Sequence, residues 1–198
     1  MEKGLIILDA SRPIWDQFFS VFPLVLIGTK EGSQFDLAPK HMAMPMSWDN
    51  YFGFVCTPRH RTYQNIVEHK TFTVSYPKPS QVVMTSLAAT PRCDEEVEKG
   101  VLQALPTRPA NLVDGVFLED AYLYLECELH KIYDDFGSNS LITGKVIGAY
   151  LDEHYAKQMG KDEQLQINDY PLLSYIHPGR FVEIHQTMAF PFPKNFKK

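Results

Sequence analysis

The segment from Ala121 to Leu129 alternates strictly along the chain, and this pattern constrains the fold more than any other feature. One side of an extended chain here carries small or aliphatic side chains, which are Leu123, Leu125, Cys127 and Leu129. The other side carries polar or phenolic side chains, which are Tyr122, Tyr124, Glu126 and Glu128. A period of two predicts a β-strand with one face in the core and the other toward water.

Other short segments show the same preference for extended structure. Residues 141–151 continue the pattern, and Gly144 and Gly148 there indicate bulges or close approach of another segment. Further strands are predicted for residues 22–29, 51–57, 71–76 and 180–184. Helices are predicted for residues 62–70 and 80–89, and a polar surface helix or loop for residues 152–164. Many strands with few helices favour a barrel over a layered α/β fold.

Length and charge narrow the class of protein. The 198 residues suit a single domain, residues 1–198, with a sizeable core. The formal net charge of -5 argues against non-specific nucleic-acid binding, which requires a basic surface. The N-terminal apolar run is too short for a signal peptide, and no stretch reaches the roughly 20 apolar residues of a membrane helix. We therefore expect a cytoplasmic protein that does not enter a membrane.

The three cysteines, an odd number without metal-knuckle spacing, predict neither a zinc site nor a disulfide framework. We expect Cys56 and Cys127 to be small apolar core residues. The seven histidines show no ligand spacing on one element, so no metal site is predicted. Motifs for Ser-His-Asp hydrolysis, Rossmann binding and the P-loop are also missing.

The sequence "PRHRTYQNI" at residues 58–66 is a candidate anion site. Arg59 and Arg61 immediately precede a helix for which Thr62 is the predicted N-cap. A helix N-terminus offers unpaired backbone N–H groups and a partial positive charge, to which guanidinium groups add. The simpler interpretation is a basic loop with a threonine cap, and the motif alone does not decide between the two.

The region around this motif resembles the flavin reductase-like family, which binds FMN in a split β-barrel. The family pattern is Asn-x-Ala-Pro, a serine about eight residues later, an apolar strand, a basic loop with Thr-x-x-Asn-Ile, and a strand ending in Val-Asn. This chain supplies Asp36-Leu37-Ala38-Pro39, then Ser47, "YFGFVC", Thr62 to Ile66, and Val74-Ser75. Looser similarity extends the resemblance over most of residues 20–185. It implies a mainly β, Greek-key split barrel with a few short helices.

The resemblance also implies roles for individual residues. The segment from Asp36 to Ser47 would lie along the isoalloxazine ring and ribityl chain, and the basic loop would hold the phosphate. Arg92 corresponds most nearly to a basic residue of the flavoredoxin-like subgroup, and Asn139 stands where that subgroup tends to have a histidine. The implied FMN-binding residues are therefore Asp36, Ala38, Pro39, Lys40, Ser47, Arg59, Arg61, Thr62, Arg92 and Asn139.

Four positions depart from the family pattern. Asp36 replaces the usual asparagine, and a carboxylate cannot donate a hydrogen bond as an amide does. It would also repel a reduced, anionic flavin. Ser75 replaces the asparagine after Val74, Asn139 replaces a histidine, and Met42 replaces an aromatic residue. These changes bear on the electron donor and on reactivity more than on FMN binding itself.

The function implied is that of an FMN-dependent flavin reductase or flavoredoxin-like carrier, which takes electrons from NAD(P)H and passes them to flavin or an unidentified acceptor. An FMN-binding module for storage or sensing is an alternative, favoured by Asp36 and Asn139. A pyridoxamine-phosphate-oxidase-like enzyme is a third. Family members build the flavin site from two subunits, so we expect a homodimer. Trp15, Trp48 and the Tyr122/Tyr124 pair are interpreted as packing or dimer-contact residues.

Overall fold

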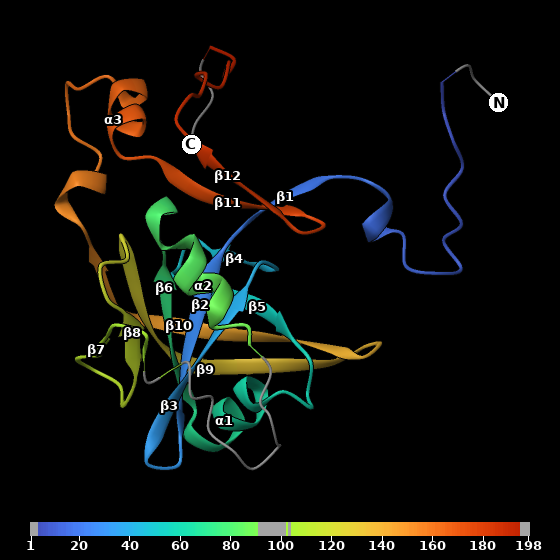
Figure 1. The fold of residues 1–198 in the computed structure, drawn as a ribbon, viewed down its shortest axis with the longest axis vertical. Coiled ribbons are helices and arrows are strands. Elements are labelled where there is room, and N and C mark those ends of the chain that lie inside the picture. Colours follow the sequence, from blue (N-terminus) through green and yellow to red (C-terminus); the bar gives the residue numbers. More distant parts are fainter. Residues whose placement is uncertain (1–3, 91–101, 103, 195–198) are drawn as a thin grey trace.

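The computed structural model describes residues 4–90, 102 and 104–194, and it confirms a mainly β architecture (Figure 1). The large sheet has seven strands in the order β3-β2-β6-β9-β10-β5-β4. A second sheet has the order β1-β11-β12, and a third pairs β7 with β8. All pairs are antiparallel.

The strands are β1 Ser20–Pro23, β2 Val25–Glu31, β3 Gln34–Lys40, β4 Ala43–Ser47, β5 Tyr51–Cys56, β6 Thr71–Tyr76, β7 Thr107–Pro109, β8 Val116–Leu118, β9 Leu123–Phe136, β10 Asn139–Leu151, β11 Leu172–His177 and β12 Arg180–Ile184.

The large sheet curls into a split barrel because its two edge strands are neighbours in sequence. β3 and β4 lie at opposite edges of the sheet, yet only His41 and Met42 separate them. A link of two residues spans only roughly 7–10 Å, so the two edges must approach one another. No ladder joins β3 to β4, and the barrel therefore stays split at this seam. Pro39 and Pro45 lie in these edge strands, where a missing N–H is tolerated.

Several strand predictions are confirmed, and one is wrong. The strands predicted at 51–57, 71–76 and 180–184 correspond to β5, β6 and β12. The strand predicted at 22–29 is in fact two, since β1 joins the small sheet and β2 joins the barrel, with the break at Leu24. Pro23 ends β1 because proline cannot donate to a ladder. The sequence patterns did not predict β3, β4, β7, β8 or β11, which lack clear alternation or contain proline.

The glycines of β10 do mark irregular pairing, as predicted. The β9–β10 register shifts between Thr143 and Gly144 and again between Val146 and Gly148. A Cβ atom added at Gly144 would lie 2.5 Å from the Phe72 ring, which packs across it. Gly144 therefore allows the core aromatic to contact the backbone of β10 directly.

Three α-helices accompany the sheets within the described residues: α1 Arg61–His69, α2 Val82–Leu87 and α3 Glu163–Asp169. Shorter turns of 3-10 helix are η1 Trp15–Gln17, η2 Pro79–Gln81 and η4 Glu153–Tyr155. The predicted helix at 80–89 is thus shorter than expected, and only two ends of the predicted 152–164 segment are helical. α1 closes one end of the barrel by inserting Ile66, which is fully buried in the core. Within the described residues, no helix is long and apolar enough to span a lipid bilayer.

The inner face of β9 is as predicted, but its outer face is not. Cys127 is fully buried among the barrel core residues, with Leu125 and Leu129 packed beside it. Tyr124 and Glu126 were expected to face water, and they are buried as well. The chain from Ala110 to Phe117 returns over this face, and Phe117 packs on the Tyr124 ring at 4.9 Å between centroids. The prediction was wrong because alternation within a strand does not show what a later or earlier segment covers.

Glu126 is held in this layer by backbone amides. Its carboxylate accepts hydrogen bonds from the N–H groups of Asn111, Leu112 and Val113 at 3.1, 2.6 and 2.8 Å. Glu126 is fully buried, so these donors replace the water that a carboxylate would otherwise bind. Cys56 and Cys127 are also buried and free, as predicted, and burial raises the pKa of both thiols.

Candidate functional site

The turn between β5 and α1 carries the cationic residues predicted to bind phosphate. β5 ends at Cys56, and His60 is the extended residue that precedes the first turn of α1. The His60 N–H donates to the Thr57 carbonyl at 2.9 Å, which tightens the turn. Arg59 projects into solvent at the tip of this turn. A nine-residue helix, its positive end and an exposed guanidinium therefore meet at one place.

Arg61 and Thr62 are already engaged in the protein's own packing. The Arg61 Nε lies 3.8 Å from Glu31 Oε1, and its Nη1 donates to Gln64 Oε1 at 3.3 Å. Thr62 is buried within the first turn, and the predicted N-cap role is wrong because His60 holds the extended cap conformation. Of the two arginines proposed for an anion, Arg61 is therefore the one already bound to neighbouring side chains, and Arg59 is exposed at the tip of the turn.

Asp36 lies in the barrel wall close to the element that carries these cations. It is buried in β3, directly opposite Thr29 of β2. The Thr29 hydroxyl accepts a hydrogen bond from the Asn65 side-chain amide of α1 at 3.0 Å, which fixes the helix on the barrel. Ala38 is also largely buried. Any ligand contact from this part of β3 would involve backbone groups more than side-chain surface.

A second group of predicted residues converges at the same end of β5. Asn139 begins β10, and its side-chain oxygen accepts a hydrogen bond from the Thr57 hydroxyl at 3.0 Å. Burial raises the pKa of the Cys56 thiol, and the nearby Lys40 ammonium opposes that rise through its charge and a hydrogen bond. Lys40 and Asn139 are thus brought beside the turn that carries Arg59. The sequence patterns did not indicate Thr57, although its position at the end of an apolar strand, just before Pro58, is a usable signal.

Ser47 lies apart from this group. It pairs with Tyr51 at the opposite end of β5, and the strand rise places it roughly 17 Å from Cys56. Its hydroxyl accepts from the Asp49 N–H at 3.1 Å and lies 3.2 Å from Asp49 Oδ2. Ser47 also lines a pocket of about 440 Å³ at the ends of β4, β5, β9 and β10. A ligand that contacts both Ser47 and Arg59 would have to lie along β4 and β5.

Pro39 and Arg92 are the remaining residues that were predicted to bind FMN. Pro39 is half-buried at the end of β3, where it leads directly into Lys40 and the β3–β4 seam. Arg92 lies outside the residues that the structure describes. In the described part of the chain, no three histidine, cysteine, aspartate or glutamate side chains are grouped so that they could hold a metal ion.

A seven-stranded barrel split at the β3–β4 seam is the fold of the split-barrel class of flavin proteins. The sequence profile of the flavin reductase like domain matches residues 20–181. The chain belongs to that family. No curated protein sequence is similar enough to count as a match.

Solved structures of similar proteins agree on this fold. Flavoredoxin from Methanosarcina acetivorans aligns with a TM-score of 0.76 at 20% identity, covering 96% of this chain and 97% of that one. The FMN-binding protein from Thermus thermophilus, solved with bound 1-cyclohex-2-enone, aligns with a TM-score of 0.74 at 19% identity, covering 94% and 99%. The 2-nitrobenzoate 2-nitroreductase from Pseudomonas fluorescens aligns at 0.73 and 17% identity, covering 89% and 87%. Identities this low establish a shared fold.

Proposed function

We propose that this protein binds FMN and acts as a flavin oxidoreductase, taking electrons from NADH or NADPH and passing them to flavin or to an acceptor protein. Family membership supports flavin binding. One structural neighbour is the flavin reductase component of a bacterial two-component tryptophan halogenase, which gives a precedent for a partner that consumes the reduced flavin. We further propose a cytoplasmic homodimer.

The observation that carries the proposal is the exposed cationic start of α1. A phosphate monoester carries about two negative charges at neutral pH and accepts several hydrogen bonds. Arg59 can donate to it without first breaking a protein contact of its own in the described structure, and the first-turn amides of α1 add their partial positive charge. Lys40 and Asn139 lie at the same end of β5. These residues fit the phosphate end of FMN.

The remaining residues would position and shield the cofactor. The backbone from Ala38 to Lys40 forms the end of edge strand β3 beside the seam, and the buried Ala38 adds little side-chain bulk there. FMN, when bound, would supply the redox chemistry by accepting hydride from the nicotinamide. No side chain is then required as a general acid or base, and the tasks of this chain are to bind, to orient and to exclude water.

The proposal is tested by titrating FMN into purified protein and following the quenching of flavin fluorescence. Arg59→Gln removes a charge-assisted hydrogen bond and should weaken FMN binding roughly 10- to 100-fold. The matched control is Arg180→Gln in the exposed strand β12, which should leave the affinity unchanged. Wild-type protein that stays colourless and leaves the fluorescence unchanged at high FMN concentration would remove the proposed function.

Storage or sensing of FMN is the second candidate, favoured by the carboxylate of Asp36 at the position where the family has an amide. An aspartate buried beside the site cannot donate a hydrogen bond to the flavin when ionised. Mixing the FMN complex with NADH or NADPH without oxygen separates the two functions. Loss of the flavin absorption within seconds supports the oxidoreductase, and a spectrum that does not change supports the binding module.

A further inference from the structure

A cluster of four rings joins the small sheet β1-β11-β12 to the barrel at the β3–β4 seam. His41 lies in the link between β3 and β4, and its ring packs against Tyr175 of β11 at 4.7 Å between centroids. Phe22 of β1 contacts the same imidazole edge-to-face at 5.5 Å, and His177 of β11 stacks on it at 5.7 Å. We call these four residues the ring clasp. In Figure 1 the small sheet lies above the barrel, at the opposite end from α1.

The two imidazoles of the ring clasp are placed unusually for histidines. His41 Nε2 and His177 Nδ1 are buried and have no hydrogen-bond partner in the described structure. The other ring nitrogen of His177, Nε2, lies 2.8 Å from a carboxylate oxygen of Asp16. Buried polar atoms of this kind are uncommon and costly, and the cost increases sharply when the group becomes charged.

The charges around His41 oppose its protonation. Burial lowers the pKa of His41, and the neighbouring His177 and Lys40 lower it further. The phenol of Tyr175 accepts a hydrogen bond from the Gly179 N–H at 2.8 Å and brings no negative charge. Among the described residues, the carboxylate that contacts the clasp is that of Asp16, which is bound to His177 and largely exposed to solvent. A positive charge at His41 would therefore lie in a partly buried position near the Lys40 ammonium.

We propose that the ring clasp is a proton-operated latch, which holds the small sheet against the seam when the His41 imidazole is neutral and releases it in acid. The direction of this pH effect follows from the difference in proton uptake between the closed and open states. The separated state lets His41 take its proton near the ordinary histidine value of about 6.5, whereas the closed clasp takes it only at lower pH. The open state therefore binds more protons below about pH 6.5, and acid favours opening.

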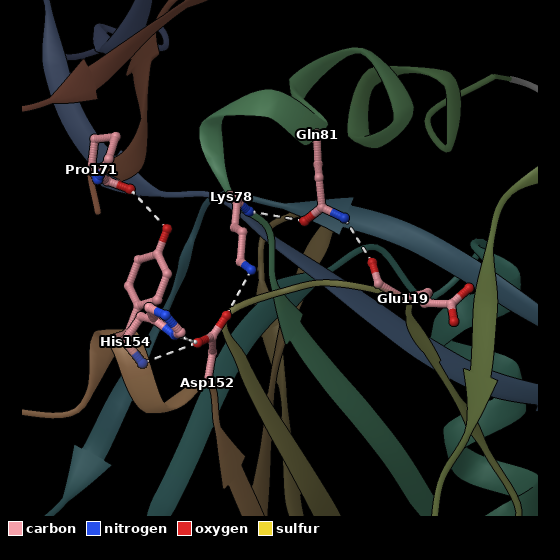
Figure 2. A network of polar contacts seen from close by, with 7 residues as sticks. Lys78, Gln81, Glu119, Asp152, His154 and Pro171 are labelled. Carbon is pink, nitrogen blue, oxygen red and sulfur yellow. Dashed lines mark hydrogen bonds and ion pairs between the residues drawn. The ribbon is translucent and has the colours of Figure 1, made fainter. Parts of the chain in front are cut away.

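A second set of contacts keeps the C-terminal hairpin attached when the latch opens (Figure 2). Lys78 Nζ donates to Asp152 at 2.7 Å, and the His154 N–H donates to the other oxygen of the same carboxylate at 3.1 Å. The Tyr155 hydroxyl donates to the carbonyl of Pro171, the residue before β11, at 3.4 Å. The bond from Lys78 lowers the pKa of Asp152, so this anchor persists through the pH range in which histidines titrate. The motion is thus a hinge about the anchor.

Opening of the latch would alter the candidate FMN site, and this consequence rests on the proposed function. His41 follows Lys40 directly and forms half of the link across the seam. Release of the small sheet removes the packing that fixes this link and lets Lys40 move. Acid should therefore weaken FMN binding in addition to any effect on the cofactor itself.

The latch is tested without FMN by amide hydrogen exchange on the whole chain at pH 7.5 and pH 5.0, corrected for the intrinsic dependence of exchange on pH. After this correction, the amides of β11 and β12 should exchange roughly tenfold faster in acid, and the amides of β9 should not. His41→Phe keeps a ring at the centre of the clasp but removes its proton, so it should abolish most of the acid response. His41→Gln, which also cannot take up a proton, replaces it should the first variant fail to fold.

Three results would overturn the latch: no acid response in the wild type, an equal response in β9, or a full response in both variants. FMN affinity at the two pH values is then compared between wild type and His41→Phe. A smaller acid loss in the variant supports the link to Lys40, whereas an identical loss removes it. If no FMN binds at any pH, the proposed function fails while the exchange measurement still decides the latch.

Discussion

At the scale of single residues, the buried carboxylate of Glu126 shows how a polar side chain can serve as a structural core residue. It replaces water for three consecutive amides and so fixes the segment that covers the outer face of β9. Its neighbour two positions on, Glu128, lies on the same strand face and stays exposed. The two residues occupy equivalent places in the sequence pattern, but another segment of the chain covers Glu126 and leaves Glu128 exposed.

Glu126→Gln should destabilise the fold, because the amide NH₂ cannot accept a hydrogen bond and leaves at least one buried donor without a partner. We expect a loss of about 2–3 kcal/mol in the free energy of unfolding. Glu128→Gln is the matched control and should change stability by less than about 0.5 kcal/mol. Urea denaturation followed by circular dichroism measures both. Equal stabilities for the two variants would contradict the structural role given to Glu126.

At the scale of elements, the end of β6 and the end of β10 are joined by an ion pair that is mostly shielded from water. The side chains of Lys78 and Asp152 are 29% and 24% exposed. The Gln81 side chain extends the network, since it accepts from the Lys78 N–H at 3.0 Å and donates to the Glu119 carbonyl at 2.7 Å (Figure 2). Tyr155 stacks on Tyr122 beside the pair at 4.6 Å.

Lys78→Met should therefore cost about 1–2 kcal/mol of stability at neutral pH, because it leaves the Asp152 carboxylate partly buried without its cation. Lys157→Met is a matched comparison. Lys157 and Glu163 approach to 2.6 Å, a similar distance, but their side chains are 78% and 70% exposed. Exposed pairs contribute little, so this variant should lose less than about 0.5 kcal/mol. Thermal unfolding compares them, and equal losses would show that exposure does not decide the value of these pairs.

At the scale of the whole molecule, β4, the link before it and the turn after it expose an apolar stripe. The stripe consists of Met42, Met44, Met46 and Trp48. Contiguous exposed apolar surface of this kind marks an interaction site more often than a free surface. The stripe lies along an edge strand of the barrel, and Met42 at its start follows Lys40 and His41 in the chain. The proposed homodimer would cover it.

The double change Met44→Glu with Trp48→Glu should convert the proposed dimer to a monomer, because it places charges within the apolar contact. Sedimentation velocity of the purified protein measures the change. Met159→Glu is the control, since Met159 is fully exposed in a loop and its replacement should leave the association state unchanged. A wild-type protein that sediments as a monomer at micromolar concentration would contradict the expectation.

Much of the β architecture could be predicted from local pattern, and the candidate site only in part. Strands such as β6 and β12 were found because their residues favour extended structure and proline or glycine bounds them. Thr62 was misplaced as an N-cap because the signal for a cap is a residue type, whereas the cap itself depends on which residue, here His60, has the extended conformation. The pairing of Thr57 with Asn139 joins residues far apart in sequence and could not be read from either one.

By itself the sequence determined the periods of the strands, the cationic segment before α1 and the resemblance to an FMN-binding family. Only the tertiary structure decided that the break at Leu24 divides two sheets, that β3 and β4 meet at a seam, and that His41 packs on His177. The physical reason is that the spacing of apolar side chains shows only that one face of a segment prefers to be buried. Which segment supplies the other side depends on the path of the whole chain, because burial is a property of contacts between distant residues.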